Sequence, residues 1–244
     1  MRYWLPALIA ALLLSPAAAR AQEPVDVALV LLADASGSID PDELRLQREG
    51  YAEALASPEV LNAIRTNAHQ KIAVAFVEWG APESQDIVAG WTVIAGEADA
   101  RAFGRRIVDA PRRTYGYNSI SNAIGVALRL FDGMPVAPER QVIDVSGDGP
   151  NIGGRPIHAA RDEAVARGIT INALAIRNRG SSVAWSTQRT GLPLEDYYRD
   201  NVIGGPGAFV VPAEDRASLL QALRTKLVLE IARSDPARRG GENG

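Results

Sequence analysis

Apolar and polar residues follow one another along the chain in blocks that predict strands followed by helices. Val25–Ala33 is a nearly continuous apolar run, which is typical of a strand covered on both faces. Asp40, Pro41 and Glu43 then match the N-cap, the first-turn proline and the glutamate of a capping box. We therefore expect a helix to follow the strand and to end at about Ala56.

The later segments repeat this pattern. Further strands are expected at Lys71–Trp79, Ile87–Ile94, Gln141–Ser146, Ile169–Ile176 and Ala208–Val211. Further helices are expected at Glu97–Ala110, at Ile120–Phe131, from the loop after Gly154 to about Arg167, and in a last segment where Leu219, Leu223, Leu227 and Ile231 recur every four residues. The predicted fold class is α/β, a single doubly wound, mostly parallel sheet with helices on both faces. Because the short Ala81-Pro82 turn joins two of the strands, one antiparallel edge strand is expected.

The two ends of the chain differ from this core. Arg2 precedes the apolar run Leu5–Leu14, and small residues end at Ala21, so residues 1–21 are typical of a secretory signal peptide. The run is shorter than the roughly 20 residues that cross a bilayer, and we expect no membrane span after cleavage. The prediction is an exported protein, periplasmic or extracellular, with one domain at 22–233 and a disordered polar tail at 234–244.

Composition excludes several kinds of partner and cofactor. The formal net charge is -3 and no basic stripe occurs, which argues against a nucleic-acid partner. The chain has no cysteine and only two histidines, so disulfides, thiolate ligands and a multi-histidine zinc site are not expected.

Polar side chains with oxygen donors follow several of the predicted strands. In open parallel sheets, ligands bind beyond the carboxyl ends of the strands, where the strand order reverses. If the loops meet there, the shared site contains Asp34, Ser36, Ser38, Asn118 or its neighbour Ser119, and Asp148. Carboxylates among neutral oxygens suit Mg²⁺, Ca²⁺ or Mn²⁺. The alternative is a plain capping turn, but Asp40 and Glu43 already supply the capping.

The same residues carry a resemblance to a known family. Asp34-Ala35-Ser36-Gly37-Ser38 resembles the D-x-S-x-S signature of the metal-ion-dependent adhesion site in von Willebrand factor A domains, and Asp148-Gly149 resembles its later aspartate. The longer segments DASGSID, VIDVSGDGPN, GITINALAI and YYRDNVIGGPGAF resemble a bacterial family of exported A-domain-like proteins of unknown function, DUF1194.

The resemblance implies a role for each site residue. Ser36 and Ser38 would bind the ion directly, and Asp34 and Asp148 would hold it directly or through water. Asn118 stands where the family has a threonine, with Ser119 or Ser121 as alternatives. The implied cofactor is one divalent cation, Mg²⁺ first, with Ca²⁺ or Mn²⁺ as alternatives. The implied partner is a protein that supplies a Glu or Asp to the metal.

The sequence is compatible with two other functions. A metal-assisted hydrolase would use Asp148 with His158 as its base, but no G-x-S-x-G nucleophile elbow occurs. A structural domain with a vestigial site would bind no metal. We expect a binding protein that is not an enzyme.

The surroundings of the site are also predicted. The loop residues Arg112, Arg113, Tyr115 and Tyr117 border it, and they belong either to a protein interface or to a solvated loop. Asp144 lies in an apolar strand, and we expect it to be buried and to support the metal ligands indirectly.

Overall fold

The computed structural model describes residues 22–177, 189–214 and 216–232. The predicted signal peptide at 1–21 and the predicted tail at 234–244 lie outside the described residues.

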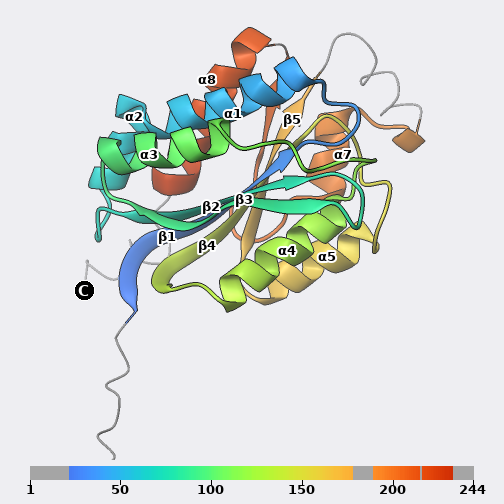
Figure 1. The fold of residues 1–244 in the computed structure, drawn as a ribbon. Coiled ribbons are helices and arrows are strands. Elements are labelled where there is room, and N and C mark those ends of the chain that lie inside the picture. Colours follow the sequence, from blue (N-terminus) through green and yellow to red (C-terminus); the bar gives the residue numbers. More distant parts are fainter. Residues whose placement is uncertain (1–21, 178–188, 215, 233–244) are drawn as a thin grey trace, which may run out of the picture.

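The described strands form one sheet of six strands in the order β3-β2-β1-β4-β5-β6 (Figure 1). Their bounds are Glu23–Asp34 (β1), Ile72–Trp79 (β2), Gln85–Ile94 (β3), Val136–Gly147 (β4), Thr170–Ile176 (β5) and Val210–Ala213 (β6). All neighbours are parallel except β2 and β3, which form an antiparallel pair at the edge. The predicted fold class and its antiparallel edge strand are confirmed.

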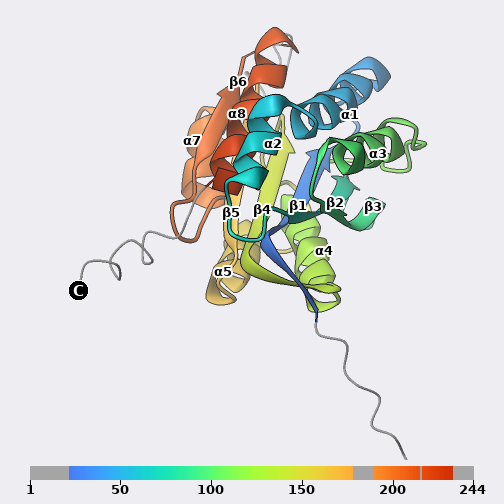
Figure 2. The ribbon, with the colours of Figure 1, turned by 90° about the vertical axis from the view of Figure 1, so that its left-hand side faces the viewer.

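Helices cover both faces of the sheet. Their bounds are Pro41–Leu55 (α1), Pro58–Arg65 (α2), Glu97–Val108 (α3), Ile120–Asp132 (α4), Ile157–Ala166 (α5), Leu194–Asn201 (α7) and Arg216–Ala232 (α8). Helices α1, α2, α3 and α8 pack on one face, and α4, α5 and α7 pack on the other (Figure 1 and Figure 2). Alternate residues of β1, such as Leu31 and Leu32, therefore enter different cores, which explains why the strand is apolar throughout.

Two helices and several strand bounds differ from the sequence prediction. Helices α2 and α7 were not expected, and each has only eight residues. β4 begins at Val136 instead of Gln141, because its polar first half pairs with β1 from Glu23 onward. β6 is displaced by two residues, to Val210–Ala213.

The strand order reverses between β1 and β4. From β1 the chain enters β2 and β3 on one side of the sheet, and β4, β5 and β6 lie on the other side. Asp34 ends β1 and Gly147 ends β4, so the loops that follow these strands start side by side at the reversal point.

Candidate metal centre

Backbone hydrogen bonds join the three polar loops at the carboxyl end of the sheet. The N–H of Gly37 donates to the carbonyl of Gly116 (2.7 Å), which ties the loop after β1 to the loop before α4. The N–H of Ile152 donates to the carbonyl of Asn118 (2.8 Å), which ties that middle loop to the loop after β4. The loops that carry the predicted site residues therefore meet.

Four of the predicted site residues form a continuous chain of contacts. Asp34 Oδ1 accepts from the N–H of Ser36 (2.8 Å), and the hydroxyls of Ser36 and Ser38 lie 3.0 Å apart. The Ser38 hydroxyl donates to Asp148 Oδ1 (3.1 Å). Residues far apart in the sequence are thus brought together as a set of oxygen atoms.

The two carboxylates of this set are buried, and in the described part of the chain no cationic side chain forms an ion pair with either. Asp34 is fully buried and Asp148 is 3% exposed. Burial raises the pKa of Asp34 well above its ordinary value, and the charge of Asp148 raises it further. Burial also raises the pKa of Asp148, although the Ser38 hydroxyl opposes that rise. Two carboxylates that are costly to ionise in this place would be stabilised by a positive charge between them.

One carboxylate oxygen finds no donor. Asp34 Oδ2 is buried and has no hydrogen-bond partner among the described residues. A β-carbon added to Gly147 would lie 3.0 Å from this oxygen and 2.8 Å from the Tyr198 hydroxyl, so only glycine leaves the space beside it free. A buried oxygen without a donor, among hydroxyls and a second carboxylate, fits a divalent cation.

The third loop presents Asn118, and its neighbours are engaged elsewhere. Asn118 is 2% exposed, and its amide nitrogen has no acceptor among the described residues. The hydroxyls of Ser119 and Ser121 donate to the carbonyl of Gly153, at 3.0 and 3.4 Å. Compared with Ser119 and Ser121, Asn118 therefore has the side chain that is less engaged by the described residues.

A buried polar chain that was not predicted supports the loop after β1. Gln47 of α1 donates to the carbonyl of Asp34 (2.7 Å) and accepts from the Ser146 hydroxyl (3.0 Å). The Tyr51 hydroxyl in turn donates to Ser146 (3.1 Å). A sequence signal for Gln47 exists, because it is a polar residue on the apolar face that Leu44 and Tyr51 define.

Arg112 holds the same loop from the outside. Its guanidinium donates to the carbonyls of Ile39 (2.9 Å), Ala35 (2.8 Å) and Ser36 (2.7 Å). The prediction offered an interface or a solvated loop for this residue, and the structure gives it a third role. Arg112 fixes the backbone that carries the two serines.

Asp144 does not support the metal ligands, and this prediction was wrong. It is fully buried as expected, but its Oδ1 lies 2.6 Å from the ammonium of Lys226 on α8. Ser146, one step further along the same face of β4, makes the contact toward the site instead.

Neither histidine is bonded to a hydroxyl of the site. His158 Nε2 lies 2.8 Å from Asn201 Oδ1 on α7. His69 lies next to the amino end of β2, where its backbone N–H donates to Asp26 (2.8 Å) and its ring Nε2 lies 3.2 Å from Glu139 Oε1. A base that activates Ser36 or Ser38 must lie within hydrogen-bond reach, and these contacts do not supply one.

The described residues contain no group of three or more His, Cys, Asp or Glu side chains suited to a metal ion. A metal in this part of the protein must therefore rely on fewer carboxylates together with neutral oxygens, as the loops of this site provide. Nor does any helix in the described ranges have the length and apolar character needed to cross a membrane.

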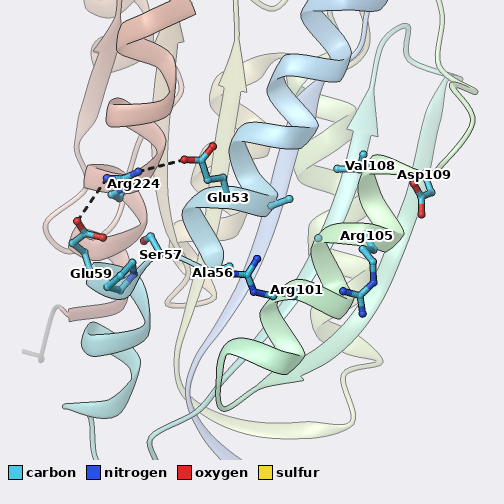
Figure 3. A pocket seen from close by; sticks show the side chains of 12 residues that line it. Glu53, Ala56, Ser57, Glu59, Arg101, Arg105, Val108, Asp109 and Arg224 are labelled. Carbon is cyan, nitrogen blue, oxygen red and sulfur yellow. Dashed lines mark ion pairs between the residues drawn. The ribbon is translucent and has the colours of Figure 1, made fainter.

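A separate hollow of about 530 Å³ lies among α1, α2, α3 and α8 (Figure 3). Arg224 lies between Glu53 (3.7 Å) and Glu59 (3.6 Å) on one side of it, and Arg101 and Arg105 extend from α3 on the other. None of the predicted site residues lines this hollow. Its charges are balanced within the protein, in contrast to the two carboxylates at the sheet end.

Comparison with known proteins agrees with this fold. The chain belongs to the family described as "Protein of unknown function (DUF1194)", which matches residues 24–235. The fold is that of a von Willebrand factor A domain, as the similarity to solved structures shows. No curated protein matched the sequence.

Three solved structures illustrate the similarity. A von Willebrand factor type A protein from Catenulispora acidiphila is 15% identical, with 86% of this chain and 44% of that chain covered and a TM-score of 0.59. Proximal thread matrix protein 1 from the mussel byssus, in a structure described as having a zinc-occupied MIDAS motif, is 17% identical, with 86% and 49% covered and a TM-score of 0.57. The pilus adhesin SpaC from Lactobacillus rhamnosus GG is 13% identical, with 86% and 31% covered and a TM-score of 0.55. The chain spans less than half of the length of each of these proteins.

Proposed function

We propose that this protein is an exported, metal-dependent protein-binding domain of the adhesion type. One divalent cation would be held by Asp34, Ser36, Ser38, Asn118 and Asp148, and a protein partner would add a Glu or Asp. The observation that carries the proposal is the buried pair Asp34 and Asp148, which forms no ion pair with a cationic side chain of the described residues and leaves Asp34 Oδ2 without a donor among them.

The donor set supports a hard cation. Every candidate ligand is a carboxylate, hydroxyl or amide oxygen, which favours Mg²⁺ first and Ca²⁺ or Mn²⁺ next. When bound, the cation would supply positive charge to the two aspartates and an open position for a further carboxylate. The relative from mussel byssus is described with zinc in its MIDAS motif, which supports a divalent ion at this place in the fold.

Protein binding is supported by the kind of protein that shares the fold. SpaC is described as a pilus adhesin. Export is supported by the signal-peptide pattern of residues 1–21. Binding without catalysis is supported by His158, whose ring is bonded to Asn201 and not to a site hydroxyl.

Isothermal titration with Mg²⁺, Ca²⁺ and Mn²⁺ on residues 22–244 tests the proposal. We expect one ion per chain, with Mg²⁺ bound in the wild type and lost in Asp148→Asn, which keeps the side-chain shape. Asp132→Asn is the matched control, because Asp132 pairs with Arg167 on the surface away from the site. A wild-type protein that binds none of the three ions would overturn the proposal.

The partner and the chemistry need a second measurement. Any captured envelope protein should be retained by the wild type with Mg²⁺ and released both by a chelator and by Asp148→Asn. Hydrolysis of a generic ester or phosphoester that is lost in His158→Ala would show instead that the site is catalytic.

A further inference from the structure

Large apolar side chains are exposed around the candidate metal centre. Tyr115 is 58% exposed, Tyr117 is 71% exposed and Ile152 is 36% exposed. Among the described residues, the other large hydrophobic side chains with comparable exposure are Ile87 on β3 and Leu229 on α8. Isolated exposed apolar residues are ordinary, whereas several on adjoining loops mark an interaction site.

Backbone bonds place two of these side chains next to a proposed ligand. Tyr117 lies between Gly116, whose carbonyl accepts from Gly37, and Asn118. Ile152 is bonded through its N–H to the carbonyl of Asn118. The two residues therefore flank Asn118 from two different loops.

The loop that carries the tyrosines is fixed to the rest of the protein. The N–H of Tyr115 donates to the Ser84 hydroxyl (2.8 Å), and its carbonyl accepts from the N–H of Ala81 (2.8 Å). A β-carbon on Gly80 would lie 2.2 Å from the same carbonyl, so the two segments are packed as closely as glycine permits. A preformed aromatic surface loses little conformational entropy on binding.

We propose that Tyr115, Tyr117 and Ile152 form an apolar rim that selects the partner of the metal centre. This inference rests on the proposed function above. The partner is an acidic protein segment in which a large apolar or aromatic residue stands beside the carboxylate that the metal takes. The metal and the rim then read two neighbouring side chains of one segment, because Asn118 belongs to the ligand set and touches the rim through its backbone.

Tyrosine suits this role for a physical reason. It offers a large contact area with few rotatable bonds, and tyrosine is enriched among the residues that dominate binding energy at interfaces. A carboxylate alone would bind any acidic residue, so the neighbouring apolar contact supplies the selectivity.

Short synthetic peptides provide the probe. One carries a central Glu flanked by Leu and Phe, a second has Ser in place of both apolar residues, and a third has Gln in place of Glu. With Mg²⁺ present, we expect the first to bind about tenfold more tightly than the second. The third peptide, and the first in the presence of a chelator, should show no binding.

Variants of the rim separate this inference from the proposed function. Tyr117→Ser and Ile152→Ser should each reduce the preference for the apolar peptide several-fold while the Mg²⁺ affinity stays unchanged. Leu229→Ser is the matched control, since Leu229 is 39% exposed on α8 and lies near Ile231, whose carbonyl accepts from Asn67 ahead of the amino end of β2.

The outcomes are distinguishable. A protein that binds Mg²⁺ but binds the apolar and serine peptides equally, or binds neither, overturns the rim and leaves the metal proposal standing. Apolar-peptide binding that survives the chelator, or that Leu229→Ser reduces as much as Ile152→Ser does, also overturns it. A protein that binds no Mg²⁺ overturns the proposed function itself.

Discussion

Two groups of buried carboxylates lie near the same central strands, and they differ in how their charge is compensated. Asp144 on β4 and Glu230 on α8 face the ammonium of Lys226, and all three are at most 1% exposed. Asp34 and Asp148, at the carboxyl end of the sheet, are buried almost as deeply, but serine hydroxyls are near them and no cationic side chain of the described ranges pairs with them.

In the first group the chain itself supplies the cation. Lys226 lies 2.6 Å from Asp144 and pairs with Glu230, and Asn172 donates to Glu230 Oε1 (3.0 Å). Burial and then the charge of Asp144 raise the pKa of Glu230 to about 7, although Lys226 opposes the rise. Arg48 and Glu78 form a second buried pair, joined at 2.6 and 2.9 Å.

Burial of carboxylates therefore does not by itself identify a metal site in this protein. Oxygen atoms without a hydrogen-bond donor occur in both groups, at Asp34 and at Asp144 and Glu230. What distinguishes Asp34 and Asp148 is that neither forms an ion pair with a cationic side chain of the described residues, whereas Lys226 pairs with both members of the other group. In the Asp144 group the folded chain provides the positive charge, and at the sheet end we propose that a metal ion does.

The largest expected effect comes from removing Lys226, the cation that pairs with Asp144 and Glu230. Lys226→Met leaves two buried carboxylates without a partner and should lower the free energy of unfolding by about 3–5 kcal/mol. Denaturant unfolding measures the loss. Lys71→Met is the control, because its pair with Glu23 is on the surface and should change stability by less than about 1 kcal/mol. Similar losses in both variants would contradict the importance of the buried group.

The pH dependence of stability should reveal the proton held by Glu230. Its pKa rises from the ordinary 4.5 to about 7 on folding, so the folded state binds more protons between these values. The free energy of unfolding should therefore fall as pH rises from 4.5 to 7, on the order of 3 kcal/mol from this group, and level off above 7.

The variant Glu230→Gln tests this assignment. It keeps a side chain of the same shape and removes the titration, so its unfolding free energy should depend less on pH over that range than the wild-type value does. Glu163→Gln, at a surface pair with Arg155, should keep the wild-type slope. Equal slopes for the wild type and Glu230→Gln would show that the proton is held elsewhere.

The stability conferred by the Asp34 and Asp148 site should depend on metal instead. Mg²⁺ at about 100 times its dissociation constant should raise the free energy of unfolding by about 2.7 kcal/mol, because the ion binds only the folded chain. Asp34→Asn should lose this gain while remaining at least as stable as the wild type in chelator, since it removes one of two like charges. Thermal unfolding with and without Mg²⁺ makes the comparison, and a gain retained in Asp34→Asn would refute the ligand assignment.

The smallest expected effect concerns the support of the loop. Arg112→Lys keeps the charge but loses the planar fork that reaches three carbonyls, and should weaken Mg²⁺ binding about tenfold. Titration calorimetry measures it, with Arg113→Lys as the neighbouring control. Unchanged affinity in Arg112→Lys would mean that the loop keeps its form without this residue.

The sequence predicts most of the fold, because long elements carry clear patterns. The capping residues of α1 and the apolar run of β1 locate both elements within about two residues of their observed bounds. The eight-residue helices α2 and α7 escape detection, since two turns give little periodicity. Ser57 and Pro58, which begin α2, are the local signal that indicates its start.

The candidate ligands could be predicted from the sequence, but the partners of the nearby buried carboxylate could not, because only the ligands carry a local pattern. Asp34, Ser36 and Ser38 belong to one recognisable loop, and Asp148 follows a strand of its own. The partners of Asp144 could not be read from the sequence, because Lys226 lies far along the chain and reaches it only when α8 packs on the sheet.

The sequence by itself therefore determined the order of the six strands and the five longer helices of the described residues, the oxygen-only character of the candidate ligands and the lack of cysteine. These properties are local, since they depend on residue types and their spacing. Only the tertiary structure decided which buried carboxylates obtain a cationic side chain and which do not. The physical reason is that a buried charge is compensated by neighbours in space, and parallel strands bring together residues that the sequence keeps far apart.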